Sequence, residues 1–84
     1  MRLTVRYFAV LRERAGVEAE VLSWDGPAPD VGGLRQHLAD RTPALGGLLR
    51  SASLLVAVNR EYAAPGTPLR DGDEIAFLPP VTGG

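Results

Sequence analysis

The segment that decides the fold is Asp71–Gly84, which reads DGDEIAFLPPVTGG. Its first two residues are a turn signal, and the residues after them predict a strand from Asp73 to Leu78. Pro79 has no N–H to donate to a β-ladder, so strand pairing is expected to end there. The chain therefore divides into a folded domain, residues 1–78, and an extended tail, residues 79–84, that closes with two glycines.

Working outward, the N-terminal third predicts a pair of strands joined by a short helix. Residues 3–8 alternate between apolar and polar side chains, as expected for a strand with one buried face. Residues 9–15 are good helix formers and lead to Gly16, a residue suited to the position after a helix end. Residues 17–24 alternate again. Because the connection is short, we expect these two strands to be antiparallel.

The middle of the chain predicts the main helix. Asp30 is placed to cap its first turn, and the helix should run to about Arg41. Its apolar stripe falls at helical spacing and consists of Val31, Leu34 and Leu38. Thr42 precedes a proline and therefore avoids the helical region, so the helix should end there. Pro43 is a favourable first residue for a further short helix.

The remaining strand signals complete a mixed sheet. Residues 54–59 are almost wholly apolar, which is typical of a central strand covered on both faces. Residues 61–63 predict a short edge strand. Strands at both ends of the chain and one amphipathic helix between them indicate an α+β roll, a mixed sheet wrapped around a single main helix.

Composition excludes several classes of protein. The chain has 84 residues, enough for one core, and 45% of them are hydrophobic, too many for a disordered chain. A net charge of −1 argues against a nucleic-acid-binding surface. There is no cysteine and one histidine, so disulfides, thiol catalysis and multi-histidine metal sites are excluded. No stretch approaches the roughly 20 apolar residues that span a bilayer, so we expect a cytoplasmic protein.

This layout resembles the β-grasp, or ubiquitin-like, fold. The residues that narrow the match are Tyr7-Phe8-Ala9, the Leu34–Leu38 segment, Val56–Asn59 and, above all, the closing Leu69–Gly84 segment. Together they are similar to the small subunit of molybdopterin synthase, and the resemblance spans essentially the whole chain.

The resemblance implies a sulfur carrier for molybdenum cofactor biosynthesis that is inactive alone. In such a protein an adenylating, E1-like enzyme uses ATP to activate the carboxyl group of Gly84, which is then converted to a thiocarboxylate. The loaded carrier docks on a large catalytic subunit and donates sulfur to a cyclic pyranopterin precursor. The expected assembly is a hetero-oligomer, and the carrier itself is expected to bind no cofactor and no metal.

The site residues follow from this chemistry. Gly84 would carry the acyl-adenylate and the thiocarboxylate, and Gly83, which has no Cβ, would let the chain end enter a narrow channel. The tail and the nearby apolar residues would contact the partner, namely Leu55, Phe77, Leu78, Pro79, Pro80, Val81 and Thr82. Apolar residues beside a reactive tail are typical of a docking surface.

Several alternatives stay open. Carriers for thiamin, cysteine or another pathway share this fold and the Gly-Gly ending, and so do ubiquitin-like protein modifiers. A plain interaction module with a passive tail is a third class. His37 is expected to pack on the flank of the main helix, and the acidic residues Asp71, Asp73 and Glu74 are expected to form a solvated turn, with Asp71 bonding its own backbone.

Overall fold

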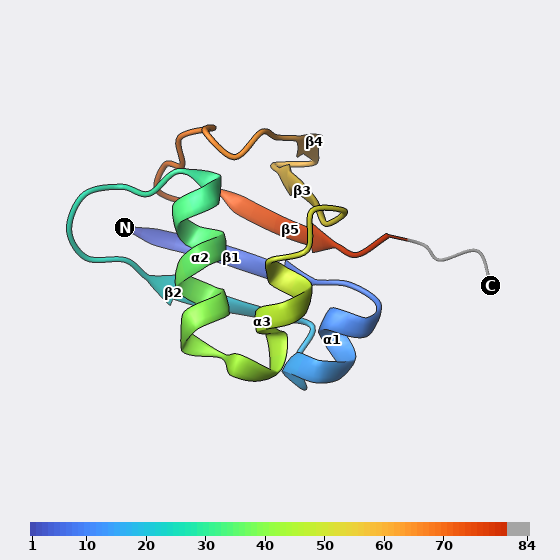
Figure 1. The fold of residues 1–84 in the computed structure, drawn as a ribbon. Coiled ribbons are helices and arrows are strands. Elements are labelled where there is room, and N and C mark those ends of the chain that lie inside the picture. The colour runs from blue at the N-terminus through green and yellow to red at the C-terminus, as the bar shows by residue number, and fades with distance from the viewer. Residues whose placement is uncertain (81–84) are drawn as a thin grey trace.

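The structure is a computed structural model, and it describes residues 1–80. Within those residues, helices lie on one face of a five-stranded sheet and leave the other face open (Figure 1). The elements in chain order are β1 (Arg2–Tyr7), α1 (Val10–Ala15), β2 (Ala19–Ser23), α2 (Val31–Arg41), α3 (Pro43–Leu49), β3 (Leu55–Val58), β4 (Glu61–Tyr62) and β5 (Glu74–Leu78).

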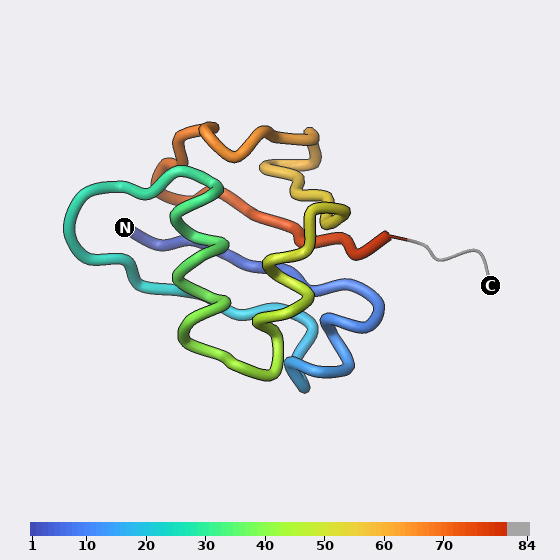
Figure 2. The backbone as a smooth tube through the Cα atoms, viewed as in Figure 1, coloured from blue at the N-terminus to red at the C-terminus, as the bar shows by residue number. Residues whose placement is uncertain are grey.

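The sheet is mixed, as the sequence predicts. Its strand order is β2-β1-β5-β3-β4. β1 pairs antiparallel with β2 and parallel with β5, and β3 pairs antiparallel with both β5 and β4. The first and last strands of the chain therefore run side by side in the middle of the molecule (Figure 2).

The core lies between the sheet and the helices. Alternate residues of β1 and β5 point into it, because successive side chains of a strand face opposite sides. They meet the buried stripe of α2, which is the stripe that the sequence predicts. The largest fully buried side chains are Leu3, Val5, Tyr7, Leu11, Val31, Leu34, Leu38, Leu45, Leu49, Leu69, Ile75 and Phe77.

Local signals set the helix ends. The Asp30 carboxylate accepts a hydrogen bond from the Gly33 N–H at 2.7 Å, so it caps α2 as predicted. Gly16 follows α1 with φ 75°, the left-handed conformation that glycine adopts without strain. Pro43 begins α3. Among residues 1–80, no helix is both long and apolar enough to cross a lipid bilayer.

One prediction about the sheet is wrong. The apolar segment 54–59 does not form the central strand, because β5 occupies the middle position and β3 lies between β5 and β4. Nor is that segment covered on both faces, since Leu55 is 49% exposed. The helices cover one face of the sheet only (Figure 1), so Leu55, which points the other way, meets solvent.

Candidate functional site

The candidate site begins where β5 ends and the tail starts. Leu78 is the last residue of β5 and lies opposite Leu55 of β3, while its neighbour Phe77 lies opposite Tyr7 of β1. Pro79 follows and is half-buried. The base of the tail is therefore held between two strands. The predicted site residues Val81, Thr82, Gly83 and Gly84 lie outside the described residues.

Beside the tail base lies the open face, defined as the sheet surface that points away from the helices. It carries Thr4, Arg6, Val21, Leu55, Ala57, Tyr62, Glu74, Ala76 and Leu78, with Phe8 beyond the end of β1. Four of its apolar side chains are strongly exposed. Phe8 is 38% exposed, Leu55 49%, Tyr62 76% and Val21 63%, whereas Leu78 is half-buried. Leu55 lies beside the end of the sheet from which the tail leaves, because it pairs with Leu78, whereas Val21 pairs with Thr4.

A groove of about 330 Å³ runs across this open face. Its apolar walls come from four different segments, and its charged groups are two arginines and one glutamate. Besides two alanines, it is lined by Arg6, Phe8, Arg60, Tyr62, Glu74 and Leu78. Apolar walls with a few charged groups are typical of a surface that binds another molecule.

Phe77 is not part of this surface, which corrects the expectation that it contacts a partner. Its side chain is 0% exposed and belongs to the core. It stacks on Tyr7 with ring centroids 6.5 Å apart. The reason is the alternation of β5, in which Ile75 and Phe77 point to the helices while Ala76 and Leu78 point to the open face.

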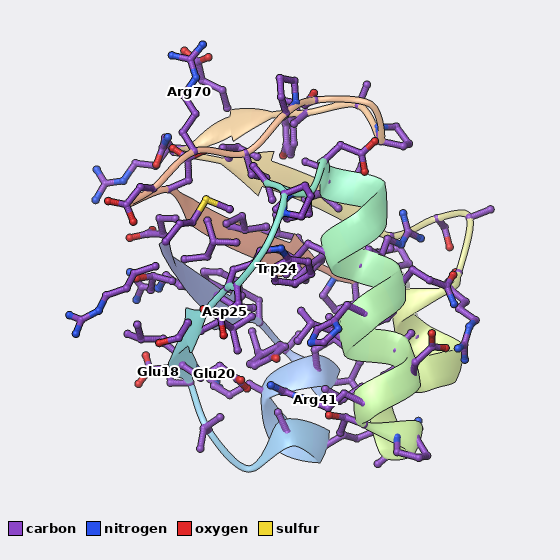
Figure 3. All side chains as sticks on the ribbon, turned by 90° about the vertical axis from the view of Figure 1, so that its left-hand side faces the viewer. Glu18, Glu20, Trp24, Asp25, Arg41 and Arg70 are labelled. Atoms are coloured by element: carbon purple, nitrogen blue, oxygen red, sulfur yellow. The ribbon has the colours of Figure 1, made fainter. Side chains whose placement is uncertain are left out.

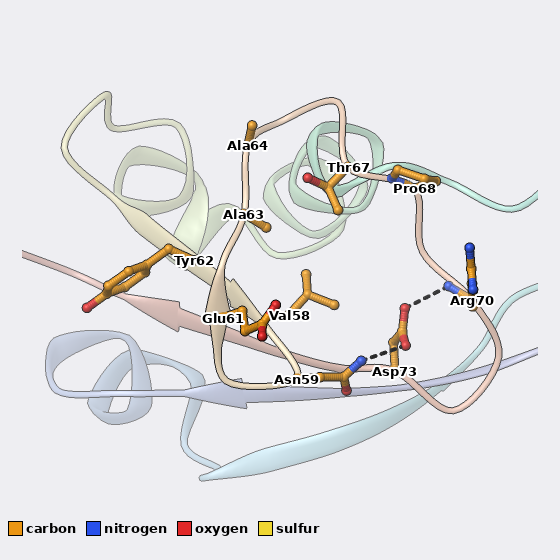
Figure 4. A pocket seen from close by; sticks show the side chains of 10 residues that line it. All are labelled: Val58, Asn59, Glu61, Tyr62, Ala63, Ala64, Thr67, Pro68, Arg70 and Asp73. Atoms are coloured by element: carbon orange, nitrogen blue, oxygen red, sulfur yellow. Dashed lines mark hydrogen bonds between the residues drawn. The ribbon is translucent and has the colours of Figure 1, made fainter.

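A second cavity, of about 440 Å³, lies behind the β3–β4 turn (Figure 4). Its polar groups already bind one another. Asn59 donates from Nδ2 to Asp73 Oδ1 at 2.8 Å, and Asp73 Oδ2 accepts from the Arg70 N–H at 2.8 Å. Asp71 does not bond its own turn as expected, since its Oδ1 accepts from the Arg2 N–H at 2.6 Å. Within residues 1–80, no group of three or more acidic or histidine side chains is placed to hold a metal ion.

A charged network links the paired strands β1 and β2 to helix α2. Arg41 reaches from the end of α2 toward Glu20 on β2 (Figure 3), with Nη1 2.8 Å from Glu20 Oε1. The Tyr7 hydroxyl donates to Glu20 Oε2 at 3.1 Å. The hydrogen bond from Arg41 lowers the pKa of Glu20 and raises that of Arg41. Burial, together with the Glu20 charge, raises the pKa of Tyr7 to about 12. The network is structural and lies on the helix side of the sheet.

Comparison with known proteins decides the family. The model of the ThiS family matches residues 5–84, nearly the whole chain. The chain belongs to the ThiS family. The molybdopterin synthase sulfur carrier subunit of Escherichia coli (strain K12) is 43% identical over 82 residues, which cover 98% of this chain and 99% of that protein. The resemblance to the small-subunit family of molybdopterin synthase is thereby confirmed.

Solved structures agree with this assignment. SAMP1 from Haloferax volcanii is 34% identical, with a TM-score of 0.82 and full coverage of both chains. A complex of subunits 1 and 2 of the molybdopterin-converting factor from Helicobacter pylori 26695 contains a chain that is 30% identical, with a TM-score of 0.68 and full coverage of both chains. The predicted ubiquitin-like β-grasp fold is confirmed.

Among residues 1–80, His37 lies in a structural contact at the side of α2. Its ring packs edge-on against Trp24 with centroids 4.9 Å apart, at the flank of α2 where the sequence predicts it. Trp24 in turn donates from Nε1 to the Pro27 carbonyl at 3.0 Å. The pair therefore fastens the loop before α2 to the helix.

Of the groove residues, only Leu78 was predicted from the sequence as a site residue; Phe8, Glu74 and two alanines were missed, and so were Arg6, Arg60 and Tyr62. Arg6 looked like one polar position in an alternating strand. The sequence predicts an edge strand at Tyr62, but it does not say on which face of the sheet the Tyr62 side chain lies. Arg60 could have been recognised as a turn residue. Val58 of β3 pairs with Glu61 of β4, so only Asn59 and Arg60 connect the two strands. Two-residue connections of this kind predict a tight hairpin turn.

Proposed function

We propose that this chain carries sulfur for molybdopterin synthase on the carboxyl group of Gly84. Its membership of the sulfur carrier family supports the proposal, and so does the family-specific ending of the sequence, PPVTGG. The structural observation that carries it is the position of Leu78. A tail attached there leaves the sheet beside an exposed apolar face, so a partner that binds this face can also receive the tail.

The chemistry starts from a carboxylate. The α-carboxyl group of a peptide has a pKa of about 3.5, so it is anionic at neutral pH. An oxygen of Gly84 attacks the α-phosphorus of ATP on an adenylating enzyme, and pyrophosphate leaves. Hydrosulfide, or a donor that delivers sulfur at the same oxidation level, then attacks the acyl carbon; the acyl–phosphate bond breaks, AMP leaves, and a thiocarboxylate and a proton remain. ATP is thus used by the adenylating partner, and the chain itself binds no cofactor.

The loaded carrier then docks on the large catalytic subunit of molybdopterin synthase. There its thiocarboxylate sulfur attacks a carbon of the cyclic pyranopterin precursor and displaces an oxygen substituent, which forms a thioester between carrier and precursor. Water then hydrolyses the acyl–sulfur bond, so that the sulfur stays on the precursor and the carrier regains its carboxylate. Two loaded carriers are consumed for each product, since a dithiolene holds two sulfur atoms. The complex of subunits 1 and 2 from Helicobacter pylori supports a partner of this class.

The tail is suited to this task. Gly83 and Gly84 have no Cβ and pass a narrow channel, and Pro79 and Pro80 are restricted to extended conformations. At about 3.3 Å per residue, the segment from Pro79 to Gly84 reaches roughly 20 Å. Val81 and Thr82 would occupy the channel of the partner together with the two glycines. The exposed side chains of Leu55, Leu78, Phe8 and Tyr62 would bind the surface of the partner outside the channel.

Intact mass spectrometry tests the proposal. The chain is incubated with the adenylating enzyme, ATP and a sulfur source, and it should exchange one oxygen for one sulfur. Gly84→Val should block this exchange and leave the fold intact. Gly66→Val is the matched control, because Gly66 has open space around its Cβ position and no left-handed φ. Absence of sulfur on the unmodified chain would refute the proposal, and full loading of Gly84→Val would refute the role of the terminal glycine.

A second function, protein modification, is supported by the likeness to SAMP1, which is named a small archaeal modifier protein. In that function the activated carboxyl group of Gly84 would join a lysine of a target. All nine basic residues of the chain are arginine, so a second copy could not be added to a lysine of the first. Single adducts on target proteins, detected as isopeptide-linked peptides, would favour modification.

A further inference from the structure

Arg60 has an unfavourable backbone conformation. Asn59 and Arg60 are the two central residues of the β3–β4 turn, with φ 49° and φ 71°. A tight hairpin turn with two positive φ angles favours asparagine followed by glycine. Asparagine tolerates the left-handed region, but an arginine there suffers a steric conflict between Cβ and the backbone. The sequence thus places a long cationic side chain where glycine would fit better.

The surroundings of the turn hold Arg60 in this conformation. Asn59 is fixed by three hydrogen bonds. Its N–H donates to the Glu74 carbonyl at 2.8 Å, and its Oδ1 accepts from the Glu74 N–H at 3.0 Å. Its Nδ2 donates to Asp73 at 2.8 Å, the bond that Figure 4 marks. Glu61, on the other side of Arg60, pairs with Val58. Strained residues of this kind persist where neighbours fix them, and they cluster at binding sites.

The strain is located at the groove on the open face. Arg60 lines this groove together with Arg6 of β1. Among residues 1–80, Arg60 makes no side-chain hydrogen bond or ion pair, and Arg6 has only Glu74 at 3.7 Å. The Nε of Arg6 has no hydrogen-bond partner in the described part of the chain. Two guanidinium groups therefore face one carboxylate, and the groove has an excess of positive charge although the whole chain has a net charge of −1.

We propose that Arg6 and Arg60 form a carboxylate-binding pair that receives an acidic side chain of the large catalytic subunit. The identity of that partner rests on the function proposed above. A guanidinium group binds a carboxylate through two parallel hydrogen bonds, which fixes its orientation. Around the pair, Phe8, Tyr62 and Leu78 supply apolar walls. The partner segment therefore has an aspartate or glutamate beside an apolar residue.

The arginine pair fixes the orientation in which the carrier docks on its partner. Apolar contacts alone are not directional, whereas charge complementarity selects one orientation and disfavours wrong partners. Arg60 comes from the β3–β4 turn and Arg6 from β1, two strands away across the sheet. A carboxylate that reaches both arginines is positioned over Ala76 of β5, the strand that leads to the tail.

The test is a double-mutant cycle on the full chain and the large subunit of its own organism, with Kd measured by titration calorimetry. Arg6→Gln and Arg60→Gln should each weaken binding about five- to tenfold, the effect of losing one partly desolvated ion pair. If both arginines bind one carboxylate, the double variant should lose less than the product of the two single effects. All losses should diminish at high salt.

Arg70→Gln is the matched control. It removes the same charge from an exposed arginine that lines the other cavity and is not part of the groove, so Kd should stay within about twofold. Arg60→Gly is a second variant that removes the side chain without backbone strain and should weaken binding as Arg60→Gln does. Thermal unfolding of each variant confirms that it is folded.

The outcomes separate this inference from the proposed function. If both glutamine variants bind like Arg70→Gln, or if their effects multiply in full, the carboxylate-binding pair is refuted while sulfur loading of the chain stands. A chain that takes up sulfur but does not bind the large subunit also refutes the pair. Failure of the unmodified chain to take up sulfur instead refutes the proposed function.

Discussion

Replacing Arg60 by glycine should make the protein more stable while it weakens docking. Arg60 has φ 71° and no side-chain hydrogen bond or ion pair within residues 1–80, so the substitution removes strain and breaks no contact of that kind. A non-glycine residue in the left-handed region costs about 1–2 kcal/mol. Glycine offsets about 0.5–1 kcal/mol of this gain, because the unfolded chain is more flexible at glycine and loses more entropy on folding. The net gain should therefore be about 0.5–1 kcal/mol.

Urea unfolding followed by the fluorescence of Trp24, the single tryptophan, measures this change. The midpoint should rise with no change in m, and Tm should rise by about 3–6 °C for a domain of this size. Asn59→Gly is the control at the neighbouring position of the same turn. It also relieves a positive φ, but it breaks the hydrogen bonds to Asp73 and Glu74 and should destabilise the fold by about 1–2 kcal/mol.

Two results would contradict the reasoning. If Arg60→Gly lowers the midpoint, the side chain contributes stability that its contacts do not reveal, and the turn is not strained for the sake of binding. If it raises the midpoint and leaves Kd for the large subunit unchanged, the strain exists but has no role in docking. The expected combination, higher stability with weaker binding, is typical of a residue retained for function.

Three further predictions concern the residues that hold the fold together. Glu20→Gln should cost about 1–2 kcal/mol at pH 7, since the Arg41 ion pair is only partly exposed. Because the folded-state pKa of Glu20 is lowered, this stabilisation is present above its unfolded pKa and is lost as pH falls through the folded value. The difference between parent and variant in urea unfolding should therefore vanish in acid, and a constant difference would count against the network. Tyr7 has its pKa raised to about 12, so its contribution is complete below pH 10 and declines from there to pH 12. Tyr7→Phe should lack that alkaline decline, and an identical alkaline profile would exclude Tyr7 as its source. Asp30→Ala should cost about 1 kcal/mol through loss of the α2 cap, and Asp30→Asn much less, as thermal unfolding of the two variants will show.

Much of the fold could be predicted because its signals are local. Asp30 caps α2 within one turn, Gly16 ends α1, and the alternation of β1 places Leu3 and Val5 in the core. In each case the residues that decide the structure lie within a few positions of one another. The order of the strands is different. β5 enters between β1 and β3, and such distant pairing leaves no local pattern in either strand.

The candidate site shows the same limit. Alternation places Phe77 and Leu78 on opposite faces, but it does not say which face the helices cover, and Phe77 proved to be the buried one. Leu55 was expected both in a strand covered on both faces and at the docking surface; its 49% exposure contradicts the first expectation, and the second stays a prediction. The groove was not predictable in this way, because Arg6 and Arg60 come to line one groove only through the pairing of β1, β5 and β3.

The central place of β5 fits the proposed function, in which a small domain has to present its C-terminal tail at a defined position. Hydrogen bonds to β1 on one side and to β3 on the other hold β5 along its length, up to Phe77 and Leu78. An edge strand would be held on one side only, and its end would fray more easily. In the proposed function, a partner that binds the open face binds the strands that fix β5. The position of the docked body would then determine where Pro79 begins.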